Sequence, residues 1–280
     1  MKRIAVLGAG TMGHGIAHAA IAGGYDTRMY DVSDAAVAKG RAAVEQIVSR
    51  GIELGKTASS DGEAMLQRLA VTANLGEALA NADLVIEAAP EKIDLKLALF
   101  EQIEQLAPPS AIVASNTSAL SITEMAGSLK DPGRVAGMHF FNPVHRMKLI
   151  EIVRALESRP ATLEAIEEVS RRMGKETVLV RESPGFITTR VNASLGNEAF
   201  YMLMEGVASA RDIDKALKLG LNHPMGPFEL VDLVGLDTRL SILEYLHRTL
   251  GEKYRPCPLL AQYVKAGRLG RKVGKGVYEY

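Results

Sequence analysis

Several features are scarce or missing in this chain of 280 residues, and each absence narrows the class of protein. There is a single cysteine, Cys257, so no disulfide can form within the chain, and a reducing, cytoplasmic setting is expected. Lys plus Arg and Asp plus Glu number 33 each, and without a basic excess we expect no nucleic-acid partner. No apolar run approaches the roughly 20 residues that span a bilayer, so no membrane segment is predicted. Apolar residues make up 47% of the chain, which is enough for a sizeable core.

The amino-terminal segment carries a glycine motif. An apolar run, Ile4–Leu7, leads directly into Gly-x-Gly-x-x-Gly. In a dinucleotide-binding turn the first glycine permits the tight bend, the second admits a pyrophosphate to the backbone, and the third lets the helix pack on the strand. The pyrophosphate then lies at a helix N-terminus, where free N–H groups favour an anion. The cofactor contacts predicted in this turn are Gly8, Gly10, Thr11, Met12 and Gly13.

An acidic residue follows at the distance that this motif requires. Asp31 ends a second strand pattern, about 20 residues beyond the glycines. Its carboxylate can accept hydrogen bonds from ribose hydroxyls and would repel a 2′-phosphate, so NAD is predicted over NADP. The glycines alone would also suit a flexible turn, and Lys2 and Arg3 before an apolar run would suit a secretory signal. The strand, helix and acid together favour the dinucleotide site.

Strand and helix patterns alternate through the first two thirds of the chain. This alternation predicts an α/β fold with a Rossmann-type, doubly wound parallel sheet. Strands are expected at Arg3–Leu7, Thr27–Asp31, Leu84–Ala88, Ala111–Ala114, Val135–His139, Leu149–Val153 and Thr177–Val180. Helices are expected at Gly13–Gly24, Asp94–Leu106 and Thr162–Met173, and two more at Ala35–Ile52 and Asp61–Leu69 would form an arm over about residues 33–69.

The pattern changes after Ser183-Pro184-Gly185, where strands nearly vanish. Helices are predicted at Phe186–Met204, Ala210–Leu219, Pro227–Val234 and Thr238–Leu250. We therefore expect a dinucleotide-binding domain at 1–183 and an all-helical domain at 184–280. The helices of the second domain are too apolar for a solvated tail, so they are expected to pack on one another and on a second subunit.

A histidine and a glutamate lie on consecutive strand patterns. His139 ends the pattern Val135–His139, and ligands of such sheets bind at the carboxyl ends of the strands. Oxidation of a secondary alcohol needs a base for the hydroxyl proton, and histidine, with an ordinary pKa of about 6.5, suits that role. Glu151, on the next strand pattern, can orient the ring. The competing readings are a core histidine, a solvated edge carboxylate at 151, and His145 as the base.

Two further strand ends carry polar groups. Residues 115–118, which include Asn116 and Ser118, can bond a substrate oxygen or the nicotinamide ribose, or can cap the helix Ile122–Ala126. Glu91 and Lys96 follow another strand end, where the alternative is an exposed ion pair that contributes little.

A pair of histidines raises the question of a metal. His14 and His18 have i, i+4 spacing on the first predicted helix, which could suit a metal ion. No matching acidic or histidine cluster supplies further ligands, and no His-Glu-x-x-His pattern occurs. No metal is therefore predicted.

With these motifs, the chain resembles the L-3-hydroxyacyl-CoA dehydrogenase family, especially its short bacterial 3-hydroxybutyryl-CoA members. The resemblance covers essentially the whole chain, and its most specific parts are His-Phe-Phe-Asn-Pro-Val at 139–144 and the carboxy-terminal block at 270–278. Other matching motifs lie at 8–13, 115–118, 184–187, 223–227 and 235–237.

The resemblance implies an NAD-dependent enzyme of fatty-acid metabolism that interconverts (S)-3-hydroxyacyl-CoA and 3-ketoacyl-CoA. It implies His139 as the base, Glu151 as its partner, and Ser118 and Asn142 against the hydroxyl or thioester region of the substrate. The matching positions near the cofactor are Glu91, Lys96 and Lys272. The arm would help to hold coenzyme A, with Lys56 as the candidate residue, and the helical domain would form a homodimer.

The chain departs from the family pattern at two positions. Thr189 replaces the asparagine of Pro-Gly-Phe-Ile-x-Asn-Arg, and His145 stands where proline is common. Threonine is shorter and offers no amide, so Thr189 is a candidate substrate contact that changes the pocket. This keeps a second reading open, a dehydrogenase of a free hydroxy acid such as carnitine or a sugar acid. A third, a non-catalytic dinucleotide-binding structural protein, would need neither His139 nor Glu151.

Overall fold

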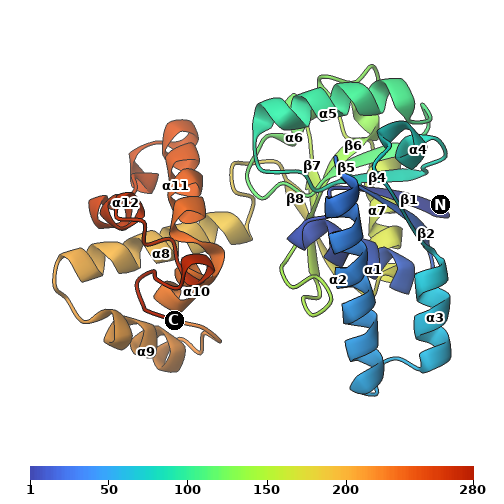
Figure 1. Cartoon of the computed structure of the whole chain (residues 1–280). Helices are drawn as coiled ribbons and strands as arrows, with labels where there is room; N and C mark the ends of the chain where they lie inside the picture. Colours follow the sequence, from blue (N-terminus) through green and yellow to red (C-terminus); the bar gives the residue numbers. More distant parts are fainter. The chain divides into compact units, whose positions relative to one another are not determined.

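The computed structural model describes residues 1–280, and the chain divides into two compact units (Figure 1). Unit 1 is Met1–Ser183 and unit 2 is Pro184–Tyr280. None of the helices combines the length and the apolar character that a membrane span requires.

Unit 1 is built on one eight-stranded sheet with the order β3-β2-β1-β4-β5-β6-β7-β8. The strands are β1 Arg3–Leu7, β2 Asp26–Tyr30, β3 Leu69–Thr72, β4 Leu84–Glu87, β5 Ile112–Ser115, β6 Val135–Phe140, β7 Leu149–Arg154 and β8 Glu176–Arg181. Strands β1 to β6 are parallel, and the chain winds outward in both directions from the β1–β4 junction. Ligands of doubly wound sheets bind at such a junction, so a ligand is expected at the carboxyl ends of β1 and β4.

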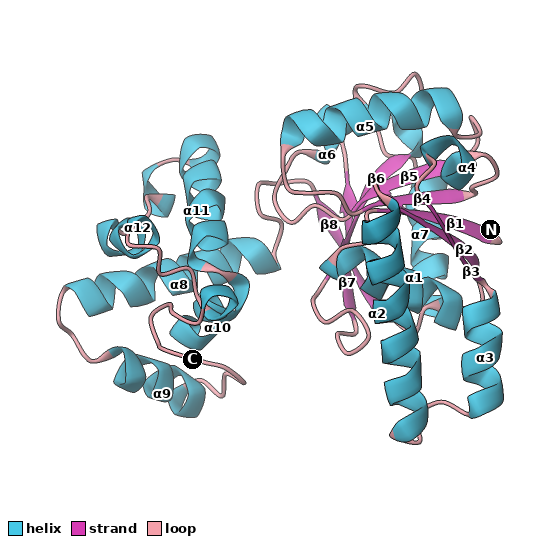
Figure 2. Cartoon of the chain, viewed as in Figure 1, coloured by secondary structure: helices cyan, strands magenta, loops and turns pink.

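Helices cover both faces of the sheet, with α5 and α6 on one face and α1 and α7 on the other (Figure 2). The helices of unit 1 are α1 Thr11–Ala22, α2 Asp34–Glu53, α3 Ser59–Gln67, α4 Leu75–Leu79, α5 Ile93–Leu106, α6 Ile122–Ala126 and α7 Pro160–Arg172. Ile16 and Ile21 of α1 and Ile166 of α7 join one apolar core with Val6 and Met138 of the sheet. The predicted Rossmann-type fold with helices on both faces is confirmed.

Strand β7 differs from the predicted arrangement because it runs antiparallel to β6. The connection between them, residues 141–148, is shorter than the dozen or so residues that a parallel crossover needs. Strand β8 pairs parallel with β7, so these two strands oppose the other six. The predicted parallel sheet therefore holds for β1 to β6, and the antiparallel β6–β7 pairing is the departure from it.

The arm contains α2 and α3, and the strand that follows it was not predicted. Helix α3 ends at Gln67, and Leu69, expected to be helical, begins β3. The two arm helices pack closely at Gly62, where a Cβ would lie 2.7 Å from the side chain of Ile52. The short helices α4 and α12 were also missed.

Unit 2 is helical, and its only β contacts are isolated bridges such as Gly270–Lys275. Its helices are α8 Thr188–Met204, α9 Ala210–Gly220, α10 Pro227–Val234, α11 Leu236–Leu250 and α12 Pro258–Lys265. Two buried carboxylates organise it. Asp214 accepts the N–H groups of Phe228 and Glu229 at the start of α10, and Asp232 accepts two N–H groups of the chain end, at Val277 and Tyr278.

Candidate active site

The glycine turn between β1 and α1 has room for a ligand. Gly8 has a φ of +110°, and a Cβ on Gly13 would lie 1.7 Å from the carbonyl oxygen of Gly8. A Cβ on Gly10 would meet nothing within 4 Å, so this glycine is not required by packing. Gly10 is the N-cap of α1, which has neither a side-chain cap nor an acidic residue in its first turn. These free N–H groups and the open space at Gly10 fit a pyrophosphate.

Asp31 follows β2 and is tied to the glycine turn. Its Oδ2 accepts the N–H of Ala9 at 2.7 Å, and its Oδ1 accepts the N–H of Val32 at 2.7 Å. Each carboxylate oxygen can accept more than one hydrogen bond, so these contacts leave acceptor sites for ribose hydroxyls. The carboxylate therefore holds the glycine turn in place, and its contact with the cofactor stays a prediction.

His139 and Glu151 are cross-strand partners in the antiparallel β6–β7 pair. Nδ1 of His139 lies 2.7 Å from Oε2 of Glu151, and the residues are 4% and 0% exposed. Nε2 of the same ring lies 3.1 Å from the Ser118 hydroxyl. Glu151 is thus a buried partner rather than a solvated edge carboxylate. The ring is held between an acid and a hydroxyl, which is a geometry suited to proton transfer.

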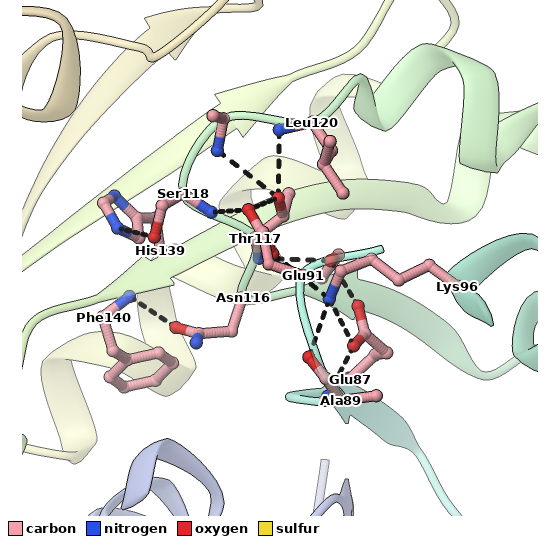
Figure 3. Close-up of polar contacts among 12 residues, drawn as sticks. Glu87, Ala89, Glu91, Lys96, Asn116, Thr117, Ser118, Leu120, His139 and Phe140 are labelled. Carbon is pink, nitrogen blue, oxygen red and sulfur yellow. Dashed lines mark hydrogen bonds and ion pairs between the residues drawn. The ribbon is translucent and has the colours of Figure 1, made fainter. Parts of the chain in front are cut away.

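The segment 115–123 carries Ser118, and its other polar side chains bond elsewhere in unit 1; Figure 3 shows those of Asn116 and Thr117. The pairs are Ser115 with Glu87, Thr117 with Glu91, and Ser121 and Thr123 with Glu182. The Asn116 side-chain oxygen accepts the N–H of Phe140 at 2.9 Å. Ser121 caps α6, so the cap that competed with a binding role lies outside 115–118.

Lys96 is buried rather than part of the exposed ion pair considered from the sequence. Its side chain is 1% exposed, and its Nζ lies 2.6 Å from Oε1 of Glu87 and 3.6 Å from Oε2 of Glu91. Glu91 accepts the N–H of Ser118 at 2.9 Å through its other oxygen. The structure therefore brings Glu91, Lys96, Ser118 and His139 into one network (Figure 3).

Glu87 is the member of this network that the sequence analysis missed. It ends β4 and is 0% exposed, and it accepts from Lys96, Ser115 and the N–H of Ala89. The sequence did contain a feature that points to Glu87, because an acidic residue that ends an otherwise apolar strand needs a buried partner. Only the fold shows that this partner is Lys96 on α5.

The rest of the predicted residues of unit 1 lie in the 141–148 loop and the arm. Asn142 is exposed where the loop begins. His145 is exposed, and its ring lies 6.4 Å from that of His18. Lys56, in the turn after α2, lines a hollow of about 900 Å³ together with Arg50, His18, His145 and Arg146.

The histidines of this hollow give no metal site. Burial lowers the pKa of His18 to about 4, and burial and the neighbouring Arg146 lower the pKa of His145. No group of three or more histidine, cysteine or acidic side chains is placed to hold a metal ion.

Two predicted residues belong to unit 2. Lys272 binds both carboxylate oxygens of Asp237 at 2.6 Å, and this contact helps to lower the pKa of Asp237. Thr189 is half-buried in the first turn of α8. The contact of Lys272 with the cofactor and that of Thr189 with the substrate both stay predictions.

The chain matches two family models along its length. They are described as the NAD binding domain of 3-hydroxyacyl-CoA dehydrogenase, at residues 3–183, and the C-terminal domain of the same enzyme, at 185–280. A probable 3-hydroxybutyryl-CoA dehydrogenase of Bacillus subtilis is 46% identical over 100% of this chain and 98% of that protein. A 3-hydroxybutyryl-CoA dehydrogenase of Bradyrhizobium diazoefficiens is 43% identical over 100% and 96%. The crystal structure of (S)-3-hydroxybutyryl-CoA dehydrogenase PaaH1 from Ralstonia eutropha has a TM-score of 0.96 and 43% identity, covering 100% of this chain and 99% of that one.

Proposed function

This chain belongs to the 3-hydroxyacyl-CoA dehydrogenase family and is an NAD-dependent enzyme, and we propose that it interconverts (S)-3-hydroxyacyl-CoA and 3-ketoacyl-CoA with His139 as the general base and acid. The observation that carries the proposal is the 2.7 Å contact of His139 with the buried Glu151, with the second ring nitrogen 3.1 Å from Ser118. A buried acid against one nitrogen fixes the ring, and the other nitrogen faces the Ser118 hydroxyl, where a substrate hydroxyl would bind.

The roles of the two residues follow from this geometry. In oxidation His139 takes the hydroxyl proton through Nε2, and in reduction it returns that proton. Bound NAD supplies the hydride acceptor for the oxidation. Glu151 accepts a hydrogen bond from Nδ1–H of His139, keeps the ring in one tautomer and stabilises the imidazolium that forms.

Ser118 and Asn142 are the proposed contacts to the substrate oxygen. The Ser118 hydroxyl is already directed at His139, so an oxygen bound beside it would lie within reach of the same nitrogen. Asn142 lies three residues after His139, exposed at the start of the loop, where its amide can donate to a carbonyl oxygen. Together they would place the substrate for proton and hydride transfer.

The cofactor contacts proposed in unit 1 are Gly8, Gly10, Thr11, Met12, Gly13, Asp31, Glu91, Lys96, Asn116 and Ser118. The open N-terminus of α1 would hold the pyrophosphate and Asp31 the ribose, while Glu91, Lys96 and residues 116–118 would flank the nicotinamide end. Lys272 is the proposed cofactor contact from unit 2.

The coenzyme A moiety is proposed to lie along the arm. The hollow beside α2 is lined by the cations of Arg50, Lys56 and Arg146, although Arg50 also pairs with Glu53 at 2.8 Å. Cationic side chains in a hollow of about 900 Å³ suit the phosphates of the carrier, which a free hydroxy acid lacks. This favours the thioester over the free acid as substrate.

The first experiment compares His139→Gln and Glu151→Gln with the wild type, with acetoacetyl-CoA and NADH followed by NADH absorbance. A positioned general base contributes about 10²–10⁴-fold, so His139→Gln is expected to lose turnover by that factor. Glu151→Gln should also lose turnover because an amide stabilises the imidazolium poorly. NADH binding, measured by fluorescence, should persist in both. The control is His247→Gln, which changes a histidine paired with Glu252 in unit 2. Near-native turnover of His139→Gln would overturn the assignment.

The acyl preference is proposed to depend on Thr189. Asparagine at this position would add an amide and fill more space, so Thr189→Asn should change the relative kcat/KM values for short, long and aryl 3-ketoacyl-CoAs. Free 3-keto acids in the same panel test the rival substrate class. Equal ratios in both proteins would show that Thr189 does not set specificity.

A further inference from the structure

The ends of β4 and β5 are joined by one buried carboxylate, that of Glu87. Its Oε1 accepts from Nζ of Lys96 and from the N–H of Ala89, both at 2.6 Å. Its Oε2 accepts from the Ser115 hydroxyl at 2.5 Å. Three donors thus satisfy a carboxylate that is wholly shielded from water.

Two chains of contacts run from Glu87 to the backbone around Thr117, and Figure 3 shows the one that passes through Lys96 and Glu91. On one side, Lys96 lies 3.6 Å from Glu91, which accepts the N–H of Ser118. On the other side, the Ser115 oxygen accepts the N–H of Thr117 at 3.2 Å. The two peptide groups on either side of Thr117, directly before Ser118, are therefore each held, one by Glu91 and one by Ser115.

The Ser118 hydroxyl in turn depends on this backbone. Its flanking hydroxyl groups are bonded to carboxylates, whereas its own oxygen lies 3.1 Å from Nε2 of His139. A shift of the peptide would move this oxygen relative to the ring. Misplacement by about 1 Å through a change far from the reacting atoms can lower a rate by about 10²-fold.

We propose that Glu87 is a positioning residue for the reaction described above: its buried carboxylate holds Lys96 and Ser115 so that Ser118 stays aligned with His139. This inference rests on the proposed role of His139 and Ser118. In this positioning role Glu87 touches neither the substrate nor the cofactor. A buried ion pair adds little net stability compared with apolar side chains of the same size, so the pair is better suited to fixing geometry than to stabilising the unit.

The test uses Glu87→Gln, which keeps the side-chain shape and removes the charge. We expect kcat with acetoacetyl-CoA and NADH to fall by about 10- to 100-fold, because Ser118 loses its support. The KM for acetoacetyl-CoA should stay within about threefold, because the arm is untouched. Glu104→Gln is the matched control, since Glu104 forms another ion pair, at 2.5 Å, with the buried Arg134 of unit 1. It should lower the melting temperature and leave kcat unchanged.

A double variant separates positioning from folding. Glu87→Gln with Lys96→Met removes both charges and should recover the melting temperature lost by Glu87→Gln, but not kcat, because Glu91 still lacks Lys96. If the double variant recovers kcat along with stability, the pair acts only in folding and the inference is wrong. The same holds if Glu87→Gln is as active as the wild type.

Ser115→Ala tests the second chain of contacts should Glu87→Gln fail to fold. It removes one hydroxyl and should lower kcat by about 3- to 10-fold with an unchanged KM. An unchanged kcat would contradict the inference. His139→Gln is measured alongside: if it keeps activity, the proposed function fails, whereas an inactive His139→Gln with an unaffected Glu87→Gln overturns only the role of Glu87.

Discussion

Single residues decide the chemistry of this protein through their strand register. His139 and Glu151 face each other because β6 and β7 pair antiparallel with these positions in register. A shift of one residue would turn Glu151 to the other face of the sheet. The acid–base pair is thus fixed by backbone hydrogen bonds rather than by a mobile loop, which suits a site that must hold its geometry.

Asp31 is the residue on which cofactor choice should depend. Asp31→Ser removes the carboxylate that would repel a 2′-phosphate, so the ratio of kcat/KM for NADPH to that for NADH should rise by at least about tenfold, a difference of about 1.4 kcal/mol. Activity with NADH should fall as well, because the Ala9 N–H loses its charged acceptor.

Asp34→Ser provides the comparison for that experiment. It changes another acidic residue, exposed in the first turn of α2, and should leave the cofactor ratio unaltered. A wild type that uses NADH and NADPH with comparable efficiency would contradict the role given to Asp31.

Among the elements, the loop 141–148 lies beside two half-buried basic side chains, those of Lys175 and His18. Lys175 follows α7 and donates to the carbonyl oxygens of Val144 and Met147, and its burial lowers its pKa. His18 of α1 lies beside the same loop, and its Nδ1 is buried without a hydrogen-bond partner. Protonation of His18 therefore adds a charge where other cations already lie.

Stability should depend on pH through His18. Its pKa falls from 6.5 to about 4 on folding, so the unfolded chain binds the proton more tightly. The contribution of neutral His18 to the free energy of unfolding is fully present above pH 6.5 and is lost as the pH falls from 6.5 toward 4. Between pH 7 and pH 5 the free energy of unfolding falls by about 2 kcal/mol through this group. His18→Gln should lose correspondingly less stability over this range in urea unfolding. An equal loss in both proteins would remove His18 as the cause.

The elements also show what could be read from the sequence. The bounds of β1, α6 and α10 agree with the prediction because each has a strong local signal, such as the proline that begins α10 at Pro227. Strand β3 is only Leu69–Thr72 and follows a helix without a break, so only its pairing with β2 defines it. The reversal of β7 was predictable from the short connection, residues 141–148.

The residues of the site also divide into those that the sequence could predict and those that only the structure shows. His139 and Ser118 could be proposed because each stands at or near the carboxyl end of a strand, where this fold places its ligands, and Glu151 because it lies on the strand pattern next to that of His139. The 2.6 Å contact between Glu87 and Lys96 could not, because it depends on how α5 packs against β4. Side-chain contacts across elements need the tertiary structure.

For the whole molecule, the resemblance found in the sequence is confirmed by the family matches at 3–183 and 185–280. The assembly remains a prediction. Unit 2 exposes large apolar side chains, including Val191, Val207, Leu219 and Leu221, each at least 62% exposed. Apolar surface of this kind is typical of a protein interface when it is contiguous.

We expect a homodimer formed mainly through unit 2. Light scattering after gel filtration should give twice the 30.1 kDa of the chain at micromolar concentration. A monomer under these conditions would count against the dimer, and its unit 2 would then expose these side chains to water.

The reversed direction of β7 and β8 also bears on how the protein can be attached to a surface. β1 begins, and β8 ends, at the same edge of the sheet, opposite the edge that carries the glycine turn and His139. Both ends of unit 1 therefore leave from the edge away from the reacting groups. An enzyme immobilised on a bead or an electrode through a tag at Met1 is tethered at that far edge, and the support does not block the edge where His139 lies.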